Sequence, residues 1–189
     1  MKSLILSISL IIFGYCNGQS SDYEAIINTN FTEYVNPFIG TSKMGHVFPG
    51  ATAPFGMVQL SPQTNFEVMF EDDGNYNSKT YEYCAGYQYR DSTIIGFSHT
   101  NLSGTGHADL GDFLVMPTTG GLVLDPLQSE NGGKGFYSEF SHDKEESSPG
   151  YYKVNLENYN IEAELTASDR VGFHQYTFPK SHDAHIILD

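Results

Sequence analysis

The sequence has 189 residues and a formal net charge of −14, with nine lysines and arginines against 23 acidic residues. A chain with so few basic residues has no positive stripe for a phosphate backbone, which excludes a nucleic-acid-binding protein. Thirteen tyrosines, thirteen phenylalanines and 19 glycines favour β-strands joined by many turns. The length fits one domain with a sizeable core.

The first 18 residues predict a secretory signal peptide. A lysine at the second position precedes an apolar run over residues 4–13, and Cys16 and Gly18 stand at the small-residue positions of a cleavage site. The run is shorter than the roughly 20 apolar residues that a transmembrane helix needs, and no later stretch approaches that length. We therefore expect an exported protein, periplasmic or extracellular. The alternative is an outer-membrane lipoprotein anchored through Cys16, which the bulky Tyr15 before it makes a poorer fit.

Residues 19–33 predict a polar lead-in, and residues 34–189 predict one β-rich domain. Without the signal peptide Cys84 is the only cysteine, so no internal disulfide can hold the fold and the core must do so. Aromatic and β-branched content predicts short strands within four stretches: 56–60, 81–89, 93–98 and 113–116.

The clearest pattern is a hairpin. Apolar and polar residues alternate over 152–156 and again over 161–165, with the turn sequence ENYN between them. A third strand follows through 171–173, and its alternation slips before Tyr176, which predicts a bulge. The apolar run at 184–189 predicts a fourth strand, and we expect the chain to be cut short of that strand's partner. The fold class is all-β, an antiparallel β-sandwich.

Residues 98–113, SHTNLSGTGHADLGDF, concentrate glycine, histidine and aspartate. Asp109 stands where a dinucleotide fingerprint needs its last glycine, and its charge would repel a pyrophosphate, so phosphate binding is excluded. His99, His107, Asp109 and Asp112 are ligand types for zinc or iron, which leaves an exported metal-dependent hydrolase as one alternative. Their spacing matches no metal motif, and turn hydrogen bonds account for the aspartates, so we expect no metal on this chain.

The same loop is suited to a neutral, hydroxyl-rich ligand. Gly104 and Gly106 let the backbone approach a ligand closely. Thr105, His107 and Asp109 offer hydrogen bonds to hydroxyl groups. No nucleophile elbow of the form Gly-x-Ser-x-Gly is present, so covalent catalysis has no sequence support. Two possible functions remain for the loop: one wall of a carbohydrate pocket, or part of a stand-alone carbohydrate-binding module.

Five stretches carry a resemblance to a known family: YVNPFIGTSKMGHVFPGATAPFGMVQLSPQT, YCAGYQY, GFSHTNLSGTGHADLGDFLVMP, PGYYKVNL and IEAELTASDRVGFHQYTFP. Together they resemble glycoside hydrolase family 92, whose members are exported, inverting, mostly calcium-dependent exo-α-mannosidases. The resemblance covers 34–189 and implies the family's N-terminal β-sandwich domain. It also implies that the catalytic carboxylates and the calcium ligands lie in an (α/α)-barrel domain outside this chain. We therefore expect this chain alone to be inactive, with a mannose-containing glycan and that catalytic domain as its partners.

The resemblance also implies substrate-binding residues. Phe38, Gly86 and Tyr87 are expected to line the site of the terminal mannose. The loop is expected to reach the leaving sugar through Gly104, Thr105, Gly106, His107 and Asp109. His107 stands where many family members have tryptophan, so the linkage preference does not carry over. No catalytic residue and no metal ligand is expected in the chain.

Overall fold

The structure is a computed structural model that describes residues 30–65, 67, 70–104, 106, 111–126 and 135–189. The chain divides into two units, residues 1–34 and residues 35–189. Of the first unit, only residues 30–34 are described, and they contain the 3₁₀ helix η1 (Phe31–Tyr34). The predicted signal peptide and most of the lead-in lie outside the described residues. No helix in the described part of the chain is long or apolar enough to cross a membrane.

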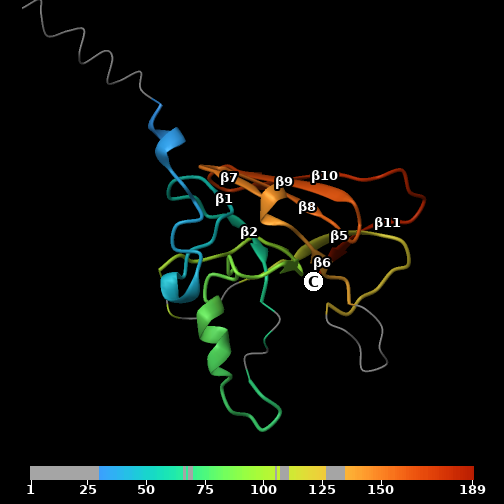
Figure 1. Ribbon diagram of the computed structural model, residues 1–189, viewed down its shortest axis with the longest axis horizontal. Helices are drawn as coiled ribbons and strands as arrows, with labels where there is room; N and C mark the ends of the chain where they lie inside the picture. The colour runs from blue at the N-terminus through green and yellow to red at the C-terminus, as the bar shows by residue number, and fades with distance from the viewer. Residues whose placement is uncertain (1–29, 66, 68–69, 105, 107–110, 127–134) are drawn as a thin grey trace, which may run out of the picture. The chain divides into compact units, whose positions relative to one another are not determined.

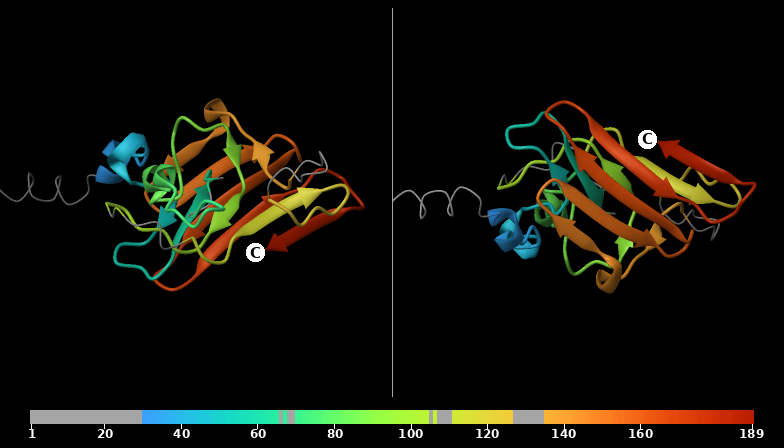
Figure 2. Two further views of the ribbon diagram at one scale, coloured as in Figure 1. Left: turned by 90° about the horizontal axis from the view of Figure 1, so that it is seen from below. Right: turned by 90° about the horizontal axis from the view of Figure 1, so that it is seen from above.

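The second unit is built from antiparallel sheets, which lie one over the other in Figures 1 and 2. The five-stranded sheet has the order β1 (Ala51–Thr52), β2 (Gln59–Gln63), β4 (Gly96–Ser98), β5 (Val115–Thr119) and β11 (Ala184–Leu188). The four-stranded sheet has the order β10 (Gly172–Thr177), β9 (Ile161–Ala167), β8 (Tyr151–Leu156) and β7 (Glu146–Ser148). A short pair joins β3 (Thr93–Ile94) to β6 (Ser138–Glu139).

The helical turns are all short. The described residues contain no α-helix, only η1 and three further 3₁₀ turns: η2 (Lys43–Gly45), η3 (Ser78–Tyr83) and η4 (His142–Lys144). The predicted all-β sandwich is therefore confirmed.

The core lies between the two large sheets, where β1 and β2 contact β9. Alternate side chains of β8 and β9 are at most 1% exposed: Tyr152, Val154, Leu156, Ile161, Ala163 and Leu165. The five-stranded sheet contributes Leu60, Phe97, Met116 and Ile187 to the same cluster. Burial of these apolar side chains is the main force that holds the sheets together. The predicted hairpin is confirmed, with β8 and β9 paired from Tyr151 to Leu156.

Two local predictions are wrong. The stretch 81–89 is not a strand, because Asn77 caps a 3₁₀ helix there by accepting a hydrogen bond from the Lys79 amide at 3.1 Å. The third strand has no bulge, because β9 and β10 pair in unbroken register along the whole of β10. Phe173 faces outward and is 54% exposed, whereas His174 takes the inward position opposite Leu165.

The last strand joins the other sheet. β11 pairs with β5 along its whole length, from Ala184 opposite Thr119 to Leu188 opposite Val115. One partner of this strand therefore lies within the chain, contrary to the expectation. Figure 2 shows β11 in dark red beside the yellow β5.

Candidate functional site

Three stretches with predicted site residues meet beside β2. The first is Gly86, whose φ of +78° is in the region that favours glycine. Its carbonyl accepts a hydrogen bond from the Thr64 amide at 2.9 Å. A Cβ at this position would lie 2.2 Å from Gln63 Oε1. Only glycine allows this turn to lie against the β2 end.

Gln63 also holds the second stretch, the segment that follows β4. Its Nε2 donates to Asn101 Oδ1 at 2.7 Å and to Ser98 Oγ. Asn101 is 3% exposed and donates to the Gln59 carbonyl at 2.9 Å. The buried Gln63 amide therefore holds the segment after β4, and the turn at Gly86 lies against the same side chain.

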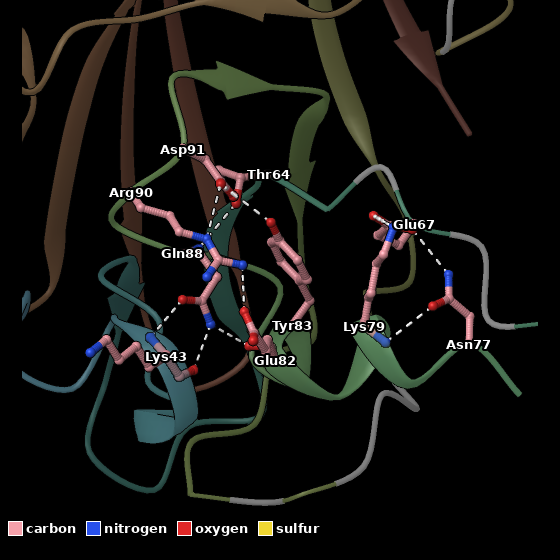
Figure 3. A network of polar contacts seen from close by, with 10 residues as sticks. All are labelled: Lys43, Thr64, Glu67, Asn77, Lys79, Glu82, Tyr83, Gln88, Arg90 and Asp91. Carbon is pink, nitrogen blue, oxygen red and sulfur yellow. Dashed lines mark hydrogen bonds and ion pairs between the residues drawn. The ribbon is translucent and has the colours of Figure 1, made fainter.

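A second buried amide, Gln88, holds the third stretch (Figure 3). Gln88 is 1% exposed, and its Oε1 accepts from the Lys43 amide at 2.7 Å while its Nε2 donates to the Lys43 carbonyl at 2.7 Å. The Nε2 group also donates to the Glu82 carbonyl. The Gln88 side chain thereby bonds both backbone groups of Lys43, the first residue of η2.

Charged residues surround this contact on the outside. Arg90 pairs with Glu82, and its guanidinium carbon lies 6.0 Å from the centre of the Tyr83 ring. The Tyr83 hydroxyl donates to Asp91 Oδ1 at 3.2 Å. Figure 3 shows these side chains on one side of η3. Burial raises the pKa of Tyr83, so its hydroxyl keeps the proton that this hydrogen bond requires.

Phe38 lies at an open hollow. The hollow has a volume of about 250 Å³ and is lined by Asn36, Phe38, Ile39, Ser42 and Tyr89. The Phe38 and Tyr89 rings meet edge to face, with centres 5.6 Å apart. The Tyr89 amide donates to the Thr41 carbonyl at 2.9 Å, which joins this turn to the segment after Gly86.

Tyr87 does not line this hollow but is buried in the core. It is 1% exposed, and its hydroxyl donates to the Glu145 carboxylate, 3.0 Å from each oxygen. Burial and the Glu145 charge raise its pKa well above the usual range. The exposed tyrosine at the hollow is Tyr89, which is not among the residues that the sequence predicts for the site. The motif YCAGYQY has a second tyrosine two residues after Tyr87, and this spacing is the only sequence signal that could have indicated Tyr89.

The glycine-rich loop is held at its start by His46. The Gly104 amide donates to the His46 carbonyl at 2.7 Å. A Cβ at Gly106 would lie 2.6 Å from the Tyr81 hydroxyl, and the Tyr81 ring meets the His46 ring edge to face at 5.0 Å. Gly104 and Gly106 therefore lie beside η2 and η3. Three other predicted site residues, Thr105, His107 and Asp109, lie outside the described residues.

The candidate metal ligands within the described residues do not converge. The His99 ring donates from Nδ1 to the Phe113 carbonyl at 3.0 Å, and its Nε2 lies 3.1 Å from His174 Nε2. The Asp112 carboxylate instead accepts from Thr100 Oγ1 at 3.2 Å. No group of three or more His, Cys, Asp or Glu side chains suited to a metal gathers in the described part. Burial, with a smaller effect of His99, lowers the pKa of His174 to about 4.

The known proteins most informative for this arrangement are glycosidases. The N-terminal domain of glycosyl hydrolase family 92 matches residues 34–189. The chain belongs to this family. The resemblance that the sequence motifs predict is thus confirmed.

Relatives of this family 92 domain are much longer than the chain. A family GH92 α-mannosidase of Bacteroides thetaiotaomicron, solved with mannoimidazole, is 44% identical with a TM-score of 0.74 and is matched over 85% of this chain and 20% of its own. An inverting mannosidase of the same organism is 26% identical with a TM-score of 0.63, over 86% and 20%. An uncharacterized secreted glycosidase of Arthroderma benhamiae is 29% identical over 153 residues, 77% of this chain and 17% of that protein. The chain spans about a fifth of the length of these relatives.

Proposed function

We propose that this family 92 domain forms one wall of the substrate pocket of an exported, inverting α-mannosidase that acts on mannose-containing glycans. The observation that carries the proposal is the hollow between Phe38 and Tyr89. The buried amide Gln88 supports it, because its side chain bonds the backbone of Lys43, next to Ser42 of the hollow, and Gln88 itself precedes Tyr89. The solved relatives described as mannosidases support mannose as the sugar.

The hollow has the chemistry that a sugar requires. Aromatic rings pack against the C–H faces of a pyranose, and Phe38 and Tyr89 supply two rings at an angle to each other. The Asn36 amide and the Ser42 hydroxyl stand at the same hollow and can bond sugar hydroxyls. Backbone groups at Gly104 and Gly106 would meet the leaving sugar.

The share of this domain in catalysis is positioning. Inverting hydrolysis needs an acid and a base carboxyl roughly 6.5–9.5 Å apart, with the attacking water between them. We place both carboxyls outside this chain. A wall that orients the sugar and excludes water lowers the barrier by fixing the reacting geometry. We accordingly expect no hydrolysis by the chain alone.

Calcium has no fitting site among the described residues. Calcium takes six to eight oxygen ligands, and the described residues contain no group of three or more Asp, Glu, His or Cys side chains that could hold a metal ion. In the proposed enzyme its ligands lie outside this chain, and no step here depends on it.

Export through residues 1–18 belongs to the same proposal. Expression of the chain with these residues in a bacterium should give a periplasmic or secreted product whose N-terminus is Gln19. A cytoplasmic product that keeps residues 1–18 would contradict export. A product that begins at a lipid-modified Cys16 would show a lipoprotein instead.

The pocket is tested by nuclear magnetic resonance titration of the chain with methyl α-mannoside. We expect weak, saturable shifts at Phe38 and Tyr89, absent with methyl α-galactoside and lost in Phe38→Ala. Phe70→Ala is the control, because Phe70 is a 59% exposed aromatic that does not line the hollow. No shift at either ring would overturn the pocket. Tight binding would identify a stand-alone binding module, and hydrolysis of an aryl α-mannoside would overturn the division of roles.

A further inference from the structure

Two histidines from different sheets meet at their ring nitrogens. His99 directly follows β4 in the five-stranded sheet, and His174 lies on β10 in the four-stranded sheet. Their Nε2 atoms are 3.1 Å apart, although the residues are separated by 75 positions. The ring centres are 4.9 Å apart and the ring planes are tilted by 35° to each other.

The remaining ring nitrogens are both held. A carbonyl only accepts, so His99 Nδ1 donates its proton to the Phe113 carbonyl at 3.0 Å, and His99 Nε2 carries a lone pair. His174 Nδ1 lies 2.7 Å from the Tyr176 hydroxyl. In the neutral pair, the His174 Nε2 proton therefore points at the His99 Nε2 lone pair.

We propose that His99 and His174 form a binding site for a divalent transition-metal ion, with Zn²⁺ as its test ion. Two nitrogens bound to one tetrahedral zinc at 2.0–2.1 Å lie about 3.3 Å apart, close to the observed 3.1 Å. The ion replaces the single proton shared by the two rings. Water or an external ligand fills the other coordination positions.

The surroundings of the two rings match those of metal-binding histidines. Such histidines donate their second ring proton to a carbonyl or another fixed acceptor, which sets ring orientation and basicity. His99 already does so at Phe113. On metal binding, the His174 proton moves from Nε2 to Nδ1, and the Tyr176 hydroxyl turns from donor to acceptor. No proton leaves the protein in this exchange.

The choice of ion follows from the ligands. Imidazole nitrogen suits Zn²⁺, Ni²⁺ and Cu²⁺, whereas Ca²⁺ and Mg²⁺ prefer oxygen. Neither histidine lines the hollow at Phe38 and Tyr89. Because His99 and His174 belong to opposite sheets, the ion would link the two layers of the sandwich. An ion that binds only the folded state raises its stability.

The test is a calorimetric titration of the 189-residue chain with Zn²⁺, with thermal unfolding measured alongside. We expect one saturable site and a rise in Tm of about 5 °C or more at a hundredfold excess of zinc over Kd. His99→Gln and His174→Gln should each abolish the site. Tyr176→Phe should weaken it about tenfold, because it removes the acceptor for His174 Nδ1. The controls His142→Gln and His185→Gln should keep it, and Ca²⁺ should give no such site.

A second readout does not depend on variants that might unfold. In the wild-type chain, zinc should shift the imidazole nitrogen signals of two of the seven histidines, and these two should be His99 and His174. Saturable binding that moves other histidines, or that survives both His→Gln changes, would overturn the proposal. So would the absence of any saturable binding of zinc by the wild-type chain.

Discussion

The Glu145 carboxylate accepts a hydrogen bond from the Tyr152 hydroxyl at 2.6 Å, at a side chain with no exposed surface. Tyr87 donates to the same carboxylate from the segment before β3, and His142 Nδ1 lies 2.6 Å from its second oxygen. The His142 ring stacks on Tyr89 with centres 4.1 Å apart. One buried acid thus connects the sandwich core to the ring that lines the proposed sugar hollow.

Glu145→Gln should destabilise the fold. The amide keeps one acceptor oxygen but places an NH₂ group against hydroxyl and imidazole groups arranged to meet a carboxylate. Hydrogen bonds to a buried charged group contribute about 1.5–3 kcal/mol, so we expect a loss of about 2 kcal/mol in the free energy of unfolding. Urea unfolding measures it. Glu146→Gln, at the neighbouring exposed position, should change the stability by less than about 0.5 kcal/mol.

Stability should fall at alkaline pH. The pKa values of Tyr87 and Tyr152 are raised above the ordinary value of 10.0 by burial and by the Glu145 charge. Above pH 10 the unfolded chain loses these protons while the folded chain keeps them. Each such tyrosine therefore lowers the free energy of unfolding by about 1.4 kcal/mol per pH unit, and below pH 10 its contribution is complete.

Urea unfolding between pH 8 and pH 12 gives this slope. Tyr87→Phe should reduce the slope by the share of one tyrosine. Equal slopes in the wild-type chain and in Tyr87→Phe would contradict the assignment.

Gly86→Ala should lower the stability of the fold by more than the positive φ of Gly86 alone explains. Gly86 and Gly74 have similar φ values, +78° and +82°, so alanine at either costs about 1–2 kcal/mol. Only at Gly86 does the added Cβ meet a buried side chain, Gln63, whereas at Gly74 nothing lies within 4 Å. We expect Gly86→Ala to lose at least 1 kcal/mol more than Gly74→Ala. Equal losses would show that the Gln63 contact relaxes at no cost.

Gln88→Leu should release the loop around η2 from the body of the domain. The change leaves the Lys43 amide, the Lys43 carbonyl and the Glu82 carbonyl without their partner, at a cost of about 1–3 kcal/mol. Hydrogen exchange should show a much faster exchange of the Lys43 amide. Gln175→Leu, on the exposed face of β10, should leave that amide protected.

The sequence predicts the parts of this fold that depend on neighbours along the chain. The hairpin of β8 and β9 follows from alternation on both sides of a four-residue turn. The stretch 81–89 carries the same aromatic content but forms the end of a capped 3₁₀ helix and a turn at Gly86, where local capping overrides strand propensity. The apparent slip in β10 came from reading Phe173 as an inward residue, when the inward position belongs to His174.

Prediction of the candidate site from the sequence is limited in the same way, because some of its contacts join distant parts of the chain. Phe38 lies at the hollow and Gly86 lies in a turn beside the end of β2, and each conformation is set by its own local turn. The choice between Tyr87 and Tyr89 depends on Glu145, which follows Tyr87 by 58 positions. The pairing of His99 with His174 likewise depends on how the two sheets stack. Spacing along a single sequence contains no record of such contacts.

The edge strand β11 should make the chain self-associate. Ile186 and Leu188 are 54% and 70% exposed on a strand at one edge of the five-stranded sheet. An exposed apolar edge pairs readily with another chain, and a lysine there opposes it. Sedimentation velocity should show association that increases with concentration in the wild-type chain and is reduced in Leu188→Lys. Leu124→Lys, at a 72% exposed leucine outside the strands, is the matched control and should associate like the wild type. A monomeric wild-type chain at every concentration, or equal association in both variants, would remove β11 as the cause.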